Sequence, residues 1–108
     1  MHAQKTSGSI TGQVTDPTGA TIANATVTLV DKSTGTNRTT TSNERGEYTF
    51  DDVQIGTYEV DVTAPGFRQF ATKGVVVNVA TATRSDAHLV TGNVSEVVTV
   101  SEIGRAHV

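Results

Sequence analysis

Short stretches in which apolar and polar residues alternate recur along almost the whole chain. Turn-forming residues separate these stretches, and apolar residues at helical spacing do not persist beyond one turn. Alternation with a period of two is typical of a half-buried strand, whereas an amphipathic helix needs apolar residues three and four positions apart. Each sheet must also bury its apolar face against another layer. The pattern therefore predicts an all-β fold, a two-sheet antiparallel β-sandwich of about seven strands.

Turn residues set the bounds of the expected strands. Asp16-Pro17-Thr18-Gly19 ends the first one, because Pro presets φ and Gly accepts a positive φ. Lys73-Gly74 is expected to link two later strands. Tyr48, Phe50 and Tyr58 occupy inward positions of the alternation, so they are expected in the core. The strands are expected over residues 9–15, 26–31, 37–41, 47–50, 57–64, 67–71, 75–79 and 83–89.

Composition supports this fold class and excludes several classes of function. A third of the 108 residues are Thr or Val (20 and 16), types that favour a pleated surface. Eight Lys and Arg against eleven Asp and Glu give no basic surface for nucleic acid. The absence of Cys excludes disulfides and thiolate chemistry. The longest apolar run, Val75 to Val77, is far shorter than the roughly 20 residues of a membrane-spanning helix.

Several motifs resemble the carboxypeptidase regulatory-like domain over residues 9–90. They are Gly12-Gln13-Val14-Thr15-Asp16, Gly46-Glu47-Tyr48-Thr49-Phe50, Ile55-Gly56-Thr57-Tyr58-Glu59-Val60 and Ala64-Pro65-Gly66-Phe67. The resemblance implies a transthyretin-like, Greek-key sandwich that serves as an accessory module and has no catalytic residues of its own. It therefore implies that the chain is not an enzyme and needs no cofactor. The same sandwich accompanies peptidases, adhesins, carbohydrate-active enzymes and outer-membrane transporters, so it does not fix the function.

A Val-rich segment follows the domain and is similar to the TonB box of TonB-dependent outer-membrane receptors. It follows a Thr91-Gly92-Asn93 linker and centres on Glu96, Val97, Val98, Thr99 and Val100. The resemblance implies a periplasmic extension ahead of the plug and barrel of such a transporter. These five residues would bind the TonB-type energy transducer by adding a strand to its sheet. The alternative is that residues 95–100 form the last strand of the sandwich itself.

The two ends of the chain carry further expectations. We expect residues 1–8 to form a flexible tail and residues 91–102 to form a linker that contains the box-like strand. His2-Ala3-Gln4 resembles the surroundings of a signal-peptidase site, which suggests that an apolar leader is missing before Met1. The sequence Ile103-Gly104-Arg105-Ala106-His107-Val108 can be translated from a common sequencing-library adapter. We therefore expect residues 103–108 to be a non-native tail.

The spacing of the His, Asp and Ser residues lends little support to a metal site or a catalytic site. The three His, at positions 2, 88 and 107, lie on different segments, so no metal-ligand spacing arises. Asp51-Asp52 could join Asp16 or Asp61 at a cation, but no Asp/Asn-Gly calcium loop is present. No Ser lies in a nucleophile-elbow sequence. We expect no metal site.

Two alternative functional classes remain. A carbohydrate-binding or adhesin-type accessory sandwich would need an exposed aromatic platform, for which only Phe67 and Phe70 are candidates. Residues 46–67 also resemble Cna-B-type stalk repeats, which form an isopeptide bond from a first-strand Lys beside a buried acid. Here the first strand has no Lys, and Glu59 and Asp61 occupy the polar face of their strand.

Overall fold

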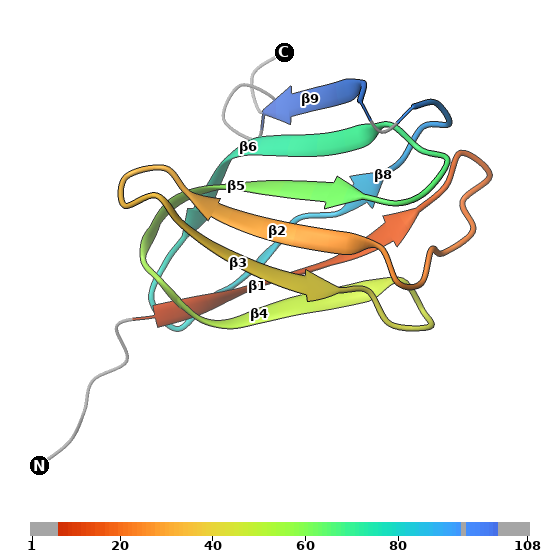
Figure 1. Ribbon diagram of the computed structural model, residues 1–108. Helices are drawn as coiled ribbons and strands as arrows, with labels where there is room; N and C mark the ends of the chain where they lie inside the picture. The colour runs from red at the N-terminus through yellow and green to blue at the C-terminus, as the bar shows by residue number, and fades with distance from the viewer. Residues whose placement is uncertain (1–6, 94, 102–108) are drawn as a thin grey trace, which may run out of the picture.

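The computed structural model describes residues 7–93 and 95–101, which form nine strands in two sheets and no helix (Figure 1). In one sheet the order is β4-β1-β7, with β8 also paired to β1. In the other sheet the order is β3-β2-β5-β6-β9. The strands are β1 Ser7–Thr15, β2 Thr26–Asp31, β3 Thr36–Thr41, β4 Glu47–Gln54, β5 Gly56–Thr63, β6 Gln69–Val77, β7 Ala82–Arg84, β8 Ala87–His88 and β9 Val97–Ser101.

The predicted all-β sandwich is confirmed, and its main ladders are antiparallel. These are the ladders that join β1 to β4, β2 to β3, β2 to β5 and β5 to β6. Three further pairings are parallel: β7 and β8 each pair with β1, and β9 pairs with β6. Alternation along one segment does not reveal the direction of its neighbour, so the pattern of residues does not predict these parallel pairs.

Strand bounds agree closely in the first half of the chain and less well in the second. The expected strand over residues 26–31 coincides with β2, and β1 includes Ser7 and Gly8, which were expected in the tail. The expected link at Lys73-Gly74 is wrong, because both residues lie within the continuous strand β6. The expected strand over residues 83–89 is divided into β7 and β8. The predictions for residues 1–6 and 103–108 lie outside the described residues.

The core is the layer between the two sheets, filled from the inward positions of both. Tyr48, Phe50 and Tyr58 are all buried, as predicted. The ring centroids of Tyr48 and Phe50 lie 6.1 Å apart in an edge-to-face arrangement, which suits the aromatic quadrupoles. Phe70 of β6 is buried as well. The other large buried side chains are aliphatic and come from five strands and the segment after β8: Ile10, Val14, Val27, Leu29, Val53, Val60, Val62, Val75, Val77 and Leu89.

Gly12 lies where β1 passes close beneath the Tyr48 ring. The Tyr48 hydroxyl donates a hydrogen bond to the carbonyl oxygen of Ser85, in the link between β7 and β8. A Cβ at Gly12 would overlap both this carbonyl and the ring. A residue without a side chain is therefore required at this position of β1, which agrees with its place in the first family-like motif.

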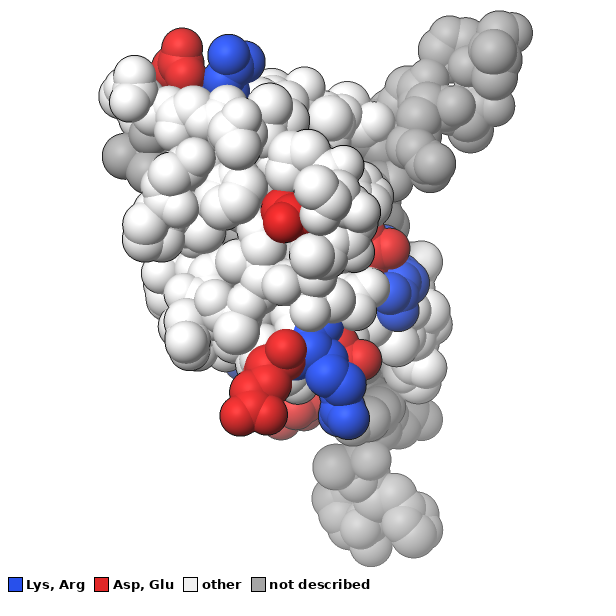
Figure 2. All heavy atoms as spheres, turned by 90° about the vertical axis from the view of Figure 1, so that its right-hand side faces the viewer, with Lys and Arg blue, Asp and Glu red and all other residues white. Residues whose placement is uncertain are grey.

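The described surface carries few charges, and they are dispersed. The face in Figure 2 shows small groups in which residues of both signs adjoin, among uncharged residues, with no extended basic surface among its described residues. Neighbouring charges pair, as in Arg45 with Glu47 and Arg84 with Asp86. Within the described ranges, no helix has the length and apolarity needed to cross a membrane.

Candidate functional site

The box-like segment lies at one edge of the five-stranded sheet. Val97–Ser101 forms β9, which runs parallel to β6 with Val98 opposite Phe70 and Val100 opposite Thr72 (Figure 1). The segment is therefore a strand of this domain's own sheet, as the alternative interpretation expected. It is nevertheless an edge strand, because β6 is the one strand among the described residues that pairs with it.

The side chains of β9 bury little surface. Val97 is 53% exposed and Val100 is 39% exposed, whereas Val98 is half-buried and packs against the core. Glu96, just before the strand, forms an ion pair with Arg68 at 3.2 Å. Its backbone carbonyl oxygen accepts a hydrogen bond of 2.8 Å from the amide of Gln69. Among the described residues, a half-buried valine, an exposed ion pair and the ladder with β6 contribute to holding this strand in place.

No strand within the described ranges pairs with the outer side of β9. In a parallel ladder, alternate residues of a strand bond to the same neighbour. Because the Gln69 amide donates to the carbonyl of Glu96, the ladder directs this carbonyl and the backbone groups of Val98 toward β6, while the Glu96 amide donates to the Asn93 carbonyl oxygen. The backbone groups of Val97 and Thr99 consequently point to the outer edge, with which no described strand pairs. Such an edge is a template for a further strand.

A second feature is the pair of carboxyl groups on the outer face of β5. Glu59 and Asp61 are two positions apart, and the Lys32 ammonium lies 2.9 Å from Oε1 of Glu59. Burial and the adjoining Glu59 carboxylate raise the pKa of Asp61 to about 7. The hydrogen bonds from Lys32 and Asp61 lower the pKa of Glu59. The pair thus shares a proton near neutral pH, with Lys32 on one side and Lys73 on the other.

Other candidates from the sequence are not brought together. His88 lies beside Thr15, with 2.8 Å between its Nδ1 and the Thr15 hydroxyl. The described residues contain no group of three or more His, Cys, Asp or Glu that could hold a metal ion. Phe70, a candidate for the exposed aromatic platform of the alternative function, does not form one, since it is 7% exposed. Phe67 is half-buried against the core, so it adds no such platform.

The carboxypeptidase regulatory-like domain model matches residues 9–90. This match spans both sheets from β1 to the end of β8 and stops before β9. The chain belongs to the carboxypeptidase regulatory-like domain family. The family assignment made from the sequence is therefore confirmed. A search of curated protein sequences finds no match.

Solved structures share the sandwich of this regulatory-like domain at low identity. A putative carbohydrate binding protein from Bacteroides uniformis is 23% identical with a TM-score of 0.63, over 79% of this chain and 42% of that one. The minor pilin GBS52 of Streptococcus agalactiae is 12% identical with a TM-score of 0.66, over 83% and 47%. Catechol 1,2 dioxygenase from Acinetobacter radioresistens is 16% identical with a TM-score of 0.62, over 90% and 58%.

These likenesses establish the fold alone. Enzymes and non-catalytic proteins both occur among the neighbours, so the sandwich does not decide whether catalysis takes place. This regulatory-like domain spans 58% or less of each of the three structures. Its function must be argued from its own surfaces.

Proposed function

We propose that the chain is a non-catalytic periplasmic accessory domain of a TonB-dependent outer-membrane transporter. Its Glu96–Val100 segment binds the TonB-type energy transducer by strand addition. The observation that carries the proposal is the place of this segment: a short, Val-rich strand at a sheet edge, immediately after the family domain ends at residue 90. The sandwich itself serves as a spacer or docking module next to the plug and barrel.

Two modes of strand addition agree with this geometry. The transducer adds to the outer edge of β9 through Val97 and Thr99, or it replaces β6 and pairs with the backbone of Glu96 and Val98. Main-chain hydrogen bonds supply affinity in both modes, so no reactive side chain is required. The weak attachment of β9 permits the second mode, because only Val98 packs against the core.

Proline substitutions test the proposal, since Pro removes an N–H group and fixes φ. Val98→Pro removes the N–H directed toward β6, and Thr99→Pro removes one directed to the free edge. Binding of the purified periplasmic domain of the transducer is measured by calorimetry. We expect one or both variants to abolish binding, and the variant that does so identifies the edge that is used.

The matched control is Thr39→Pro, which makes the same chemical change in β3 at the opposite edge of the same sheet. It should leave transducer binding unchanged. Circular dichroism checks that each variant keeps its β-sheet content. If the parent chain does not bind the transducer, or if both β9 variants bind as tightly as the parent, the box assignment is wrong.

A further inference from the structure

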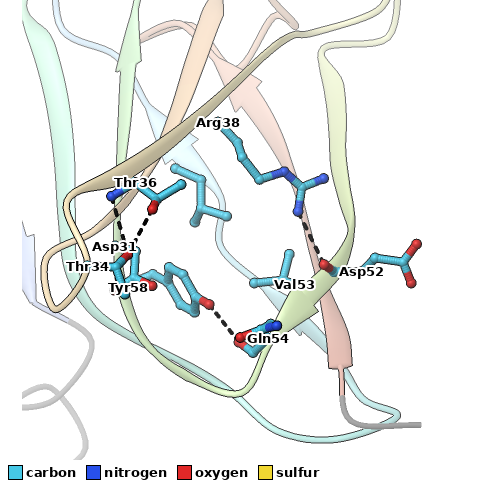
Figure 3. A pocket seen from close by; sticks show the side chains of 9 residues that line it. Asp31, Thr34, Thr36, Arg38, Asp52, Val53, Gln54 and Tyr58 are labelled. Atoms are coloured by element: carbon cyan, nitrogen blue, oxygen red, sulfur yellow. Dashed lines mark hydrogen bonds between the residues drawn. The ribbon is translucent and has the colours of Figure 1, made fainter.

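The two edges of the five-stranded sheet are held in different ways. At the β3 edge, Figure 3 shows Arg38 reaching across to β4 of the other sheet, where its Nη1 donates to the Asp52 carbonyl oxygen at 3.4 Å. Its guanidinium carbon also lies 5.6 Å from the centre of the Phe50 ring. At the opposite edge, β9 pairs with β6 and packs against the core through the half-buried Val98. Of these two edge strands, β9 is therefore the one that the fold can release more readily.

The side chain of Glu96 fastens the start of β9. Its Oε1 lies 3.2 Å from the Nε of Arg68, just before β6, and accepts a hydrogen bond of 3.2 Å from the Asn93 amide. The Glu96 amide donates to the Asn93 carbonyl oxygen at 3.0 Å, which closes a turn directly before the strand. The Gln69 amide then donates to the Glu96 carbonyl oxygen, the first ladder bond of β9. This residue therefore joins the turn, the start of β6 and the start of β9.

Gly92 provides the space in which the ion pair forms. A Cβ at this position would lie 2.6 Å from Cγ of Arg68 and 2.8 Å from Oε1 of Glu96, closer than a real Cβ approaches. Both side chains therefore pack directly against the glycine backbone. The Gly92 amide donates to the carbonyl oxygen of Gly66 at 3.2 Å, in the link between β5 and β6. The pair is thus formed over a stretch of backbone that is itself anchored to the sandwich.

The Arg68–Glu96 pair is partly buried, which suits a contact that opens reversibly. The Nε atom of Arg68 is shielded from solvent and has no hydrogen-bond partner among the described residues, so the nearby carboxylate compensates for its lost hydration. The two side chains are nevertheless 42% and 50% exposed. Ion pairs with this exposure contribute modestly to stability and are screened by salt. The pair therefore biases the position of β9 without fixing it.

We propose that the Arg68–Glu96 pair is a latch that controls the release of β9 from β6. With the latch closed, the ladder to β6 occupies the backbone groups of Val98 and Val100. With the latch open, β9 detaches as an extended segment, while the rest of the sandwich keeps its core, to which β9 contributes the partial packing of Val98. This inference rests on the proposed function for the identity of the partner: the detached segment is the form that the transducer binds.

Native-state hydrogen exchange of the full chain tests the latch without any partner. The reporting amides are those of Val98 and Val100, which face β6, and that of Val62 in the middle of the same sheet. Arg68→Met removes the charge, keeps an apolar side chain over Gly92 and leaves every residue of β9 unchanged. We expect the two β9 amides to exchange about two- to five-fold faster in this variant, with the Val62 amide unchanged.

Salt gives a second measure of the same contact. Sodium chloride should accelerate exchange of the β9 amides in the parent chain and have little effect on them in Arg68→Met, because the variant has no ion pair to screen. If Arg68→Met does not fold, Glu96→Gln replaces it, since glutamine loses the charge and retains an oxygen for the Asn93 amide.

Arg45→Met is the matched control, because Arg45 also pairs with a glutamate, Glu47, with 3.4 Å between Nε and Oε1. It should leave exchange in β9 unchanged. The latch is overturned if the β9 amides of the parent chain exchange no faster than the Val62 amide, since β9 would then open with the whole domain. It is also overturned if Arg68→Met leaves β9 exchange unchanged, or if Arg45→Met accelerates it equally.

Calorimetry with the periplasmic domain of the transducer tests the regulatory role. We expect Arg68→Met to bind more tightly than the parent chain by the factor by which it increases the opening of β9, because the binding-competent form is more populated. Equal affinity of the two chains, together with faster exchange in the variant, would overturn this role. If neither chain binds the transducer, the proposed function is wrong, whereas the exchange rates decide by themselves whether the latch holds β9.

Discussion

At the scale of single residues, Asp61 shows how a sheet surface changes the chemistry of a side chain. It lies in the middle of the five-stranded sheet, with Thr28 opposite on β2 and Ala71 opposite on β6. Burial removes solvent from its carboxyl group, and the adjacent Glu59 carboxylate makes a second negative charge costly. Lys32 and Lys73 act in the opposite direction, but burial and Glu59 dominate. Asp61 therefore keeps its proton to a much higher pH than in an unfolded chain.

Asp61→Asn should stabilise the protein at pH 8 and have little effect near pH 4. In the folded protein the pKa of Asp61 is raised from 3.8 to about 7, so its contribution to stability is complete below pH 3.8 and is lost as the pH rises through 7. Asn mimics the neutral acid and avoids this loss. We expect a gain of about 1 kcal/mol at pH 8, less than the full shift implies because the side chain is partly solvated.

Urea unfolding at pH 4, 6 and 8 measures this gain. Asp51→Asn, at an exposed carboxylate of β4, is the control and should show no comparable pH dependence. A gain for Asp61→Asn that is equal at all three pH values would contradict the assignment. The lowered pKa of Glu59 has the opposite sign, since its contribution is present above its unfolded pKa and is lost on acidification. The parent protein and the Asp61→Asn variant both contain Glu59, so the contribution of Glu59 to the pH dependence of stability largely cancels when the two are compared.

The sequence predicts the direction of side chains well and their environment poorly. Alternation placed Tyr48, Phe50 and Tyr58 inward, and all three are buried, because the two faces of a strand follow directly from its period. It also placed Asp61 on the polar face. It could not show that Lys32 and Lys73 flank that carboxylate, since cross-strand neighbours depend on register, which is set by the whole sheet.

At the scale of elements, β6 is the strand that the sequence described least well. Gly74 was expected in a link, yet β6 continues through it with a register shift opposite Tyr58 and Val60. Gly74 has a φ of 74°, which is typical of the extra residue of a β-bulge. From the sequence alone, a glycine in a β-bulge cannot be told from a glycine in a turn, because glycine accepts a positive φ in both. The pairing of β6 with β5 on both sides of Gly74 identifies a bulge.

Gly74→Ala should destabilise the protein by about 1 to 2 kcal/mol, because alanine at this φ meets its own backbone. Gly74→Asn should cost less, since Asn tolerates the left-handed region better. Lys73→Ala, at the exposed neighbouring position, is the control and should change stability little. The free energies of unfolding in urea rank the three variants. Equal stability of the Ala and Asn variants would mean that the backbone at Gly74 is not left-handed in solution.

At the scale of the whole molecule, β9 lies outside the family match and yet belongs to the same five-stranded sheet as β6. The sequence predicted this division, because the family-like motifs end before Val90 and the Val-rich segment follows them. It did not predict that β9 pairs with β6. That pairing brings together segments separated by β7 and β8, which belong to the other sheet, and no local pattern encodes it.

A chain that ends after Asn93 should therefore fold into the same sandwich without β9. The core residues belong to the other strands and their connections, apart from the partial packing of Val98. The loop anchors ahead of β9 also remain, since the amide of Arg68 donates to the carbonyl oxygen of Val90 and the amide of Gly92 to that of Gly66. We expect the free energy of unfolding to fall by about 2 kcal/mol, a minor part of the 5 to 15 kcal/mol typical of a domain.

Urea unfolding of the shortened and full chains measures this difference, with Val98→Ala and Val97→Ala in the full chain as a matched pair. Val98→Ala should lose about 1 kcal/mol and Val97→Ala much less, because Val97 is 53% exposed. A shortened chain with no cooperative transition would show that β9 is an integral part of the sandwich. A transducer that displaced β9 from β6 would then unfold the domain. Only pairing along the outer edge of β9, through Val97 and Thr99, would remain open to the transducer.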